Sequence, residues 1–94
     1  MINEINFRNF LYNQGITVAG IETRISRAYA GEKILGYTFE EAISSDEKMY
    51  KSLIKLKPYE NPKKNPMQNS LRKYYLFKYG KEFPRLSDYE RANH

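Results

Sequence analysis

Four helix-terminating residues divide this sequence more firmly than any other feature: Gly15, Gly36, Pro58 and Gly80. Between them, apolar residues recur at three- and four-residue intervals, which is the period of an amphipathic α-helix. Glycine readily takes the left-handed conformation that ends a helix, and proline cannot continue one. No stretch shows the strict alternation of a strand, and no stretch repeats another. This pattern predicts an all-α fold, a compact four- to five-helix bundle.

The first two predicted helices lie in residues 3–15 and 16–36. Thr17 is expected to be the N-cap of the second, because a threonine hydroxyl can accept a hydrogen bond from a free amide of the first turn. This helix also contains Gly20 and Gly31, each of which destabilises a helix by about 1 kcal/mol relative to alanine. We therefore expect a kink near Gly31 or a close helix-to-helix contact at Gly20.

Capping signals predict two further main helices, one before and one after a linker. Thr38 and Ser44 each begin a Ser/Thr-x-x-Glu pattern, which predicts a short turn of helix and then a third main helix. Residues 59–66 form the linker, with two Asn-Pro steps that favour extended or turn conformations. Asn65 as N-cap and Pro66 at the first helical position then predict a fourth helix.

The length of 94 residues predicts one domain, since a chain this short rarely has enough apolar surface for two cores. We expect a helical domain over residues 1–86 and a flexible C-terminal tail over residues 87–94. The sequence has no cysteine, which excludes disulfides and thiolate chemistry. No secretory leader and no run of about 18 apolar residues is present, so we expect a cytoplasmic protein without membrane association.

The net charge of +5 is unevenly distributed along the chain. Residues 1–50 carry a net charge of −2, whereas residues 51–85 carry ten basic side chains against two acidic ones. A segregated positive charge of this kind attracts polyanions. The distribution favours nucleic acid as the partner, with the alternative that a basic protein of this size has no anionic partner at all.

Few side chains are candidates for catalysis or metal binding. His94 is the only histidine and the last residue, where a solvated side chain is expected. Glu40, Glu41, Asp46 and Glu47 form an acidic cluster, but each lies near a predicted helix N-terminus, where the helix dipole favours a carboxylate. No glycine-rich phosphate loop is present. The sequence thus predicts no metal, no cofactor, no small-molecule substrate and no enzymatic activity.

The predicted fourth helix concentrates tyrosines and basic residues in one segment. A tyrosine can bury its ring while its hydroxyl reaches a polar environment, so Tyr74 and Tyr75 are expected in the core or at its edge. Asn69, Arg72 and Lys73 carry the donor groups that phosphate contacts use. The alternative is a solvated helix surface, whose long basic side chains cover apolar edges.

The order of these segments resembles a known module. Four stretches carry the resemblance: FRNFLYNQG, TVAGIETRISRAYAGEKILG, DEKMYKSLIKL and NSLRKYYLFKYGKEFP. They resemble the N-terminal core-binding, SAM-like domain of tyrosine recombinases and phage integrases, over residues 5–84. The resemblance implies a bundle of four or five helices that clamps one side of a DNA duplex. The catalytic domain that follows in those enzymes has no counterpart here, so no tyrosine is assigned a nucleophilic role.

The resemblance also implies which residues face DNA, because members of this family contact it mainly with the second and last main helices. It places Arg24 and Arg27 of the second helix at the DNA surface, with Asn69, Arg72 and Lys73 of the fourth. The remaining candidates come from the basic C-terminal segment. The predicted nucleic-acid-binding residues are Arg24, Arg27, Lys55, Lys63, Lys64, Asn69, Arg72, Lys73, Lys78 and Lys81.

The sequence leaves two functions open. The first is a non-enzymatic DNA-binding module of a phage or mobile element, which contacts phosphates through its basic C-terminal helical surface. The second is a protein-interaction module, an inhibitor or adaptor such as a phage-encoded anti-defence protein, that binds an acidic protein or a protein–nucleic-acid complex. The same aromatic and basic surface suits this second function, because Tyr and Arg often dominate the energetics of protein interfaces.

Overall fold

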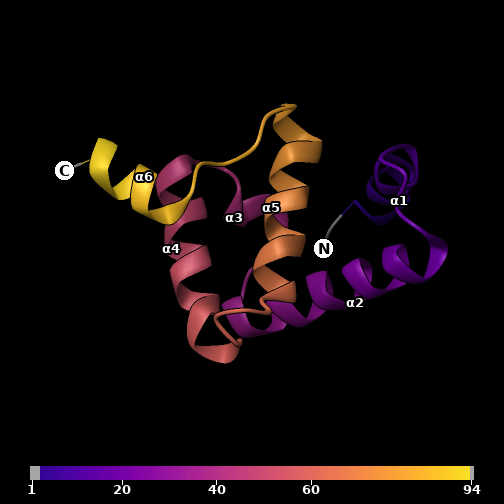
Figure 1. Ribbon diagram of the computed structural model, residues 1–94, viewed down its shortest axis with the longest axis horizontal. Coiled ribbons are helices and arrows are strands. Elements are labelled where there is room, and N and C mark those ends of the chain that lie inside the picture. The colour runs from indigo at the N-terminus through magenta and orange to yellow at the C-terminus, as the bar shows by residue number, and fades with distance from the viewer. Residues whose placement is uncertain (1–2, 94) are drawn as a thin grey trace.

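The computed structural model describes residues 3–93, which form six α-helices and one short 3-10 helix, without a β-strand (Figure 1). In chain order, the elements are α1 (Glu4–Asn13), α2 (Val18–Leu35), α3 (Phe39–Ala42), α4 (Asp46–Leu56), η1 (Lys57–Tyr59), α5 (Pro66–Tyr79) and α6 (Leu86–Ala92). The predicted all-α helical bundle is confirmed. His94 lies outside the described residues. No helix within residues 3–93 combines the length and the apolar character that crossing a bilayer requires.

Helices α2 and α5 form the frame of the bundle, with the most extensive contact of any helix pair. Helices α1, α3 and α4 pack around this pair, and α6 lies beyond α4, at the far end of the molecule from α1 (Figure 1). Gly36 and Gly80 end α2 and α5 in the left-handed conformation, with φ of 80° and 72°, as the sequence predicted. The frame therefore brings α2 into contact with α5, which crosses it at a steep angle (Figure 1).

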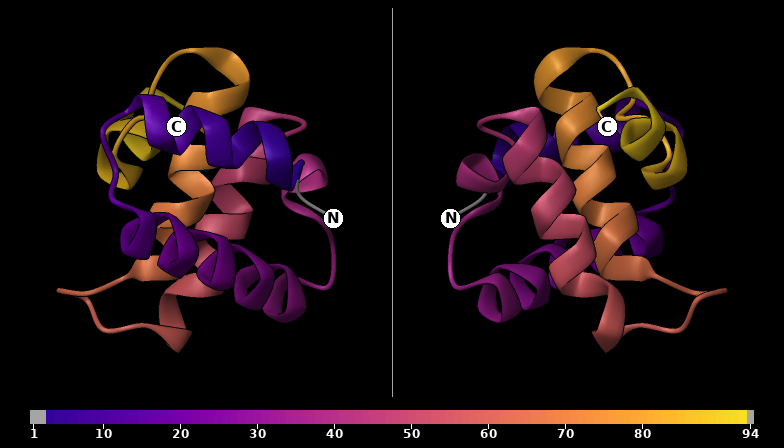
Figure 2. Two further views of the ribbon diagram at one scale, coloured as in Figure 1. Left: turned by 90° about the vertical axis from the view of Figure 1, so that its right-hand side faces the viewer. Right: turned by 90° about the vertical axis from the view of Figure 1, so that its left-hand side faces the viewer.

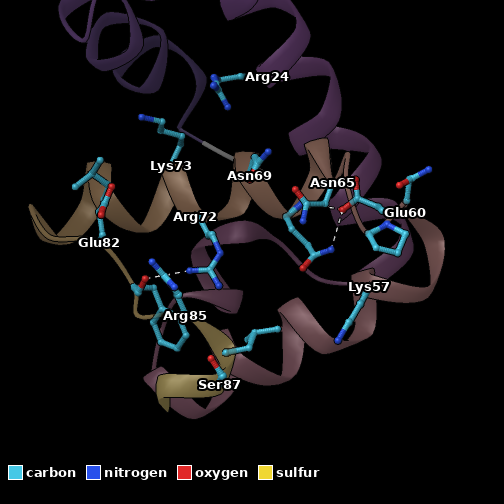
Figure 3. A pocket seen from close by; sticks show the side chains of 16 residues that line it. Arg24, Lys57, Glu60, Asn65, Asn69, Arg72, Lys73, Glu82, Arg85 and Ser87 are labelled. Atoms are coloured by element: carbon cyan, nitrogen blue, oxygen red, sulfur yellow. Dashed lines mark hydrogen bonds between the residues drawn. The ribbon is translucent and has the colours of Figure 1, made fainter. Parts of the chain in front are cut away.

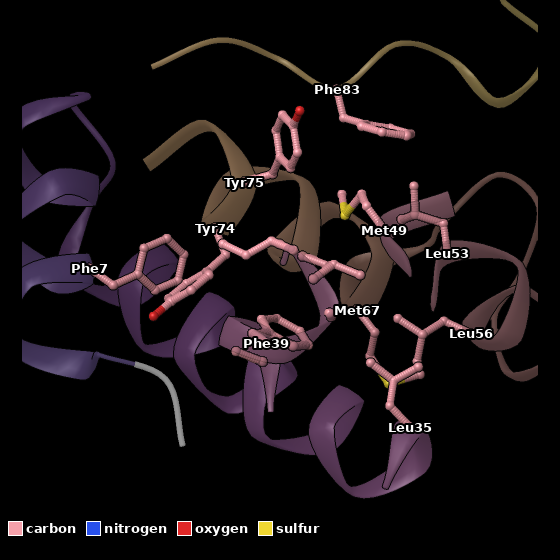
Figure 4. Close-up of a cluster of buried hydrophobic side chains, with 14 of the residues drawn as sticks. Phe7, Leu35, Phe39, Met49, Leu53, Leu56, Met67, Tyr74, Tyr75 and Phe83 are labelled. Atoms are coloured by element: carbon pink, nitrogen blue, oxygen red, sulfur yellow. The ribbon is translucent and has the colours of Figure 1, made fainter. Parts of the chain in front are cut away.

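The hydrophobic core centres on Tyr74, whose side chain is fully buried (Figure 4). Its ring meets the ring of Phe7 edge-on at 5.0 Å and that of Phe39 at 5.9 Å, measured between ring centroids. On the other side of α5, the fully buried Leu53 and Leu56 belong to the same core cluster. One tyrosine of α5 thus ties α1 and α3 together, and the predicted core positions of the fourth helix are confirmed.

The hydroxyl groups of the two buried tyrosines of α5 donate hydrogen bonds to acidic residues in the first turns of α3 and α4. Tyr74 donates to the carboxylate of Glu40 and accepts a hydrogen bond from the backbone N–H of Asn3 at 2.9 Å. Tyr75, which is 3% exposed, donates to Oδ1 of Asp46 at 2.8 Å. These carboxylates therefore connect α5 to α3 and α4 in addition to lying at helix N-termini.

The buried tyrosines predict a loss of stability at alkaline pH. Burial and the bond to Asp46 raise the pKa of Tyr75 from 10.0 to about 12, and burial raises the pKa of Tyr74 as well. The folded state therefore keeps protons that the unfolded state releases above pH 10. Below pH 10, these two tyrosines should contribute no pH dependence to the free energy of unfolding. Between pH 10 and 12, each of them should lower it by roughly 1 kcal/mol for every pH unit.

Urea denaturation followed by circular dichroism at pH 9, 10 and 11 measures this decline. Tyr75→Phe is the matched variant, because it keeps the ring and removes the titrating group. An equally steep decline in Tyr75→Phe would show that Tyr75 does not cause it.

Gly20 and Gly31 lie within α2, and the close contact occurs at a different one of the two than expected. The helix continues through both glycines. Gly31 is the position of close approach, because a Cβ there would lie 3.1 Å from two ring carbons of Phe39. At Gly20, the nearest atom is Cγ2 of Ile16, at 2.9 Å, which belongs to the preceding turn and not to another helix. The expected close contact at Gly20 is thus wrong, and Gly31 instead makes room for a core aromatic ring.

The capping predictions are right for α2 and α3 and displaced by one residue for α4. The hydroxyls of Thr17 and Thr38 each accept a backbone N–H three residues on, at 3.1 Å. The N-cap of α4 is Ser45, which accepts from the N–H of Lys48 at 3.1 Å, whereas Ser44 Oγ donates to a backbone carbonyl. Only Ser44 has the glutamate three residues on, whereas Lys48 stands at that position for Ser45, so the tertiary path of the chain overrides the local pattern.

Helix α5 is capped from a distance. Pro66 occupies its first turn as predicted, but Asn65 makes no side-chain capping bond. The carboxylate of Glu60 accepts instead from the N–H groups of Met67 at 2.6 Å and Gln68 at 2.9 Å. A linker residue thus folds back onto the helix that follows it.

Glu60→Ala should therefore lower the free energy of unfolding by about 1–2 kcal/mol, the usual effect of losing an N-cap. Thermal denaturation followed by circular dichroism checks it, with Glu82→Ala as the control, because Glu82 makes no hydrogen bond or ion pair within residues 3–93. Equal melting temperatures for the two variants would contradict this role of Glu60.

The tail predicted over residues 87–94 differs from the structure, in which Leu86–Ala92 forms α6. The ring of Tyr89 stacks on the ring of Tyr50 at 4.9 Å, and the Tyr50 hydroxyl donates to the carboxylate of Glu90. These contacts join α6 to α4 and fix the direction of the segment that follows α5.

Candidate functional site

A groove of about 810 Å³ runs along α5, between the loop that precedes this helix and the segment that follows it (Figure 3). We call it the basic groove. Its basic lining residues, the groove cations, are Arg24, Lys57, Arg72, Lys73 and Arg85. Glu60 and Glu82 are its acidic lining residues, and the Glu60 carboxylate is occupied by the amides of α5. The groove therefore carries a formal excess of positive charge.

A smaller hollow of about 320 Å³ adjoins the basic groove. Arg24 and Asn69 line both, and Arg27 and Ser70 line the smaller hollow alone. Ser70 itself is buried, and its hydroxyl donates to the backbone carbonyl of Arg24 at 3.0 Å, which holds α5 against α2. The packing of these two helices thus creates one continuous basic surface from two separate segments of sequence.

Arg72 holds one wall of the groove in place. Its Nη1 donates to the backbone carbonyls of Phe83 at 3.0 Å and Pro84 at 3.1 Å, and its guanidinium carbon lies 5.9 Å from the centre of the Phe83 ring. Partial burial lowers the pKa of Arg72, because burial disfavours the charged form. Within residues 3–93, Nη2 and Nε make no hydrogen bond, and neither atom is completely buried. These two nitrogens therefore keep unused donor capacity at the groove.

The ion pairs between side chains of residues 3–93 all lie outside the basic groove. Elsewhere, carboxylates lie within 4 Å of Arg8, Lys48, Lys51, Lys78 and Arg91. In the part of the chain that the structure describes, none of the groove cations makes such an ion pair. Lys33, Lys63, Lys64 and Lys81 also make no such ion pair within residues 3–93, so the groove is distinguished by the gathering of five cations without ion pairs around one hollow.

Half of the predicted site residues come together around the two hollows. They are Arg24, Arg27, Asn69, Arg72 and Lys73. Lys63 and Lys64 lie on the loop between η1 and α5, which projects from the body of the molecule (Figure 2). Asn61 and Pro62 of this loop line the basic groove, so the two lysines stand beside its end.

The other three predicted residues do not line the groove or the adjoining hollow. Lys55 donates from Nζ to the carbonyl of Leu35 at 2.9 Å and so binds the C-terminal end of α2. Lys78 pairs with Glu40 at 3.3 Å. Lys81 is exposed just after α5 and lines neither hollow.

The sequence candidates omit several residues that line the groove, of which Lys57 and Arg85 are basic. Lys57 follows α4 in the 3-10 helix, and Arg85 lies between α5 and α6. No helical periodicity applies at either position, so only the path of the chain reveals that they face α5. The basic segment between residues 51 and 85 was the one available signal for both.

Comparisons with protein-family models, with curated proteins and with solved structures find no match for this chain. The resemblance to recombinase domains therefore stays a prediction. Function has to be inferred from the chemistry of the groove itself.

Proposed function

We propose that the chain is a non-enzymatic nucleic-acid-binding module of the cytoplasm, which holds DNA phosphates in and around the basic groove. The observation that carries this proposal is the gathering of the five groove cations around one hollow, without an ion pair to any of them within residues 3–93. Gathering like charges without counter-ions is unfavourable for the isolated protein. An anionic ligand relieves that repulsion.

The types of side chain also suit phosphate. Arg24 and Arg27 offer planar guanidinium groups from α2, and Lys73 and Asn69 offer an ammonium and an amide from α5. Such groups bind phosphate oxygens through charge-assisted hydrogen bonds. Phosphate contacts position a protein on nucleic acid without reading the bases, so we expect weak sequence preference.

The resemblance to recombinase core-binding domains supports the same proposal. Its second and last main helices correspond here to α2 and α5, which supply three of the five groove cations, Arg24, Arg72 and Lys73. In this proposal, the chain acts as an accessory DNA-binding module of a phage or mobile element, without the catalytic domain.

A salt series tests the proposal. Fluorescence anisotropy of a labelled duplex of about 20 base pairs, and in parallel of its single strand, is titrated with the protein at several salt concentrations. Each phosphate contacted contributes about 0.9 to the log–log slope on a duplex and about 0.7 on a single strand, so three to five contacts predict slopes of roughly 2 to 4.5. Absence of binding to both nucleic acids at the lowest salt would refute the proposal.

Exposed apolar side chains favour the second function, a protein-interaction module. Ile5 and Tyr12 of α1 are 76% and 68% exposed and, seven residues apart, share one face of that helix. Val18, at the start of α2, is 72% exposed. A protein partner bound through this face would be insensitive to charge changes in the groove, which separates the two functions.

A further inference from the structure

We infer that the basic groove accepts one unstacked nucleotide, so that the chain binds single-stranded nucleic acid in preference to duplex. The inference rests on the proposed function, because the same cations would hold the phosphates. Beyond the proposed function, we infer that the nucleic acid is single-stranded and that one of its nucleotides enters the groove.

The shape of the site favours a single strand. A volume of about 810 Å³ falls in the range of about 300–1,000 Å³ that is typical of pockets for small organic molecules. In a duplex, the bases are stacked and paired, and a base can enter a protein pocket only after it leaves the stack, which requires a few kcal/mol. A single strand presents its bases without most of that cost. A duplex would contact the rim of the groove and leave its interior empty.

The lining of the groove offers more than a phosphate requires. Its apolar side chains are Pro62, Leu76, Phe83 and Leu86, and its amides are Asn61, Asn65, Gln68 and Asn69. Apolar contact suits the face of a base, and side-chain amides can donate to and accept from its edge. Cations alone would suffice for phosphate. The combination suits a whole nucleotide.

The groove cations lie at more than one margin of the groove. In Figure 3, Arg24 and Lys73 lie on one side of α5, and Arg85 lies on the other. A strand that crosses the helix would therefore find a cation before and after the nucleotide that enters. A base alone in the groove would lack these flanking contacts.

Arg72 provides a surface on which a base can stack. Two backbone carbonyls hold its Nη1, and the Phe83 ring lies beneath its guanidinium. Bases of single strands stack on arginine guanidinium planes in many complexes. Because Arg72 is already held in place, little side-chain freedom would be lost on binding.

The test compares a labelled single strand of about 12 nucleotides with the duplex of the same sequence, by anisotropy at one low salt concentration. The wild-type protein should bind the single strand at least about tenfold more tightly, since unstacking alone requires a few kcal/mol. Ser87→Trp places bulk at the exposed edge of the groove without changing any charge and should weaken single-strand binding at least about fivefold. Ala92→Trp is the control, because Ala92 is exposed on the same helix and does not line the groove.

The outcomes separate the two proposals. Equal or tighter binding of the duplex would overturn the inference and leave the proposed function standing. Single-strand binding that is as tight in Ser87→Trp as in Ala92→Trp would overturn it as well. No binding of either nucleic acid would refute the proposed function.

Discussion

Tyr74→Ala is expected to remove much of the stability of the fold, about 4 kcal/mol from a free energy of unfolding of roughly 5–14 kcal/mol for a domain of this size. Tyr74 is fully buried, and its ring contacts Phe7 of α1 and Phe39 of α3. Alanine would leave a cavity at the junction of three helices and remove the hydroxyl that Glu40 and the N–H of Asn3 share. Urea denaturation at pH 7 measures the loss.

Tyr74→Phe is the control that separates the ring from the hydroxyl. It keeps the aromatic packing and should lower the free energy of unfolding by only about 1–2 kcal/mol, the usual effect of one lost buried hydrogen bond. Equal losses in the two variants would show that the hydroxyl, and not the ring, is the important part of this residue.

The double charge reversal Arg24→Glu/Lys73→Glu is expected to lower the affinity for nucleic acid by about 100-fold or more. It removes two of the five groove cations and introduces repulsion against phosphate, an effect of several kcal/mol for like charges in contact. Anisotropy with a single strand and a duplex at low salt measures the loss. Arg72 is not used for this experiment, because its contacts with the Phe83 and Pro84 carbonyls also hold the wall of the groove.

The matched control is Lys33→Glu/Lys51→Glu, which changes the net charge by the same amount. Both lysines are exposed, and neither lines the groove or the adjoining hollow. An equal loss of affinity in the two double variants would show that total charge, and not the groove, determines binding.

The sequence predicted the main helices well, because their signals are local. Gly36 and Gly80 end helices in the left-handed conformation, and Thr17 and Thr38 cap the next ones through residues three positions away. Helix α6 was missed, because a seven-residue helix is not stable by itself and depends on tertiary packing, here of Tyr89 on Tyr50.

The candidate site was predictable in part for the same reason. Arg72 and Lys73 follow the pattern of a helix that could be identified from sequence, and the packing of α2 brings Arg24 beside them. Lys55 instead donates to the carbonyl of Leu35, 20 residues earlier in the chain. Lys78 pairs with the carboxylate of Glu40, 38 residues earlier. No local pattern indicates such pairs, so a basic residue that binds within the fold cannot be distinguished from one that is free.

The central claim is that unpaired cations around one groove bind nucleic acid. The most direct measurement is the change in backbone amide chemical shifts when the ¹⁵N-labelled protein is titrated with a single strand of about 12 nucleotides at low salt. We predict that the largest changes occur in three places: residues 24–27 of α2, 68–76 of α5 and 82–87 after it. Changes concentrated instead around Ile5 and Tyr12 on α1, or no changes at all, would contradict the claim.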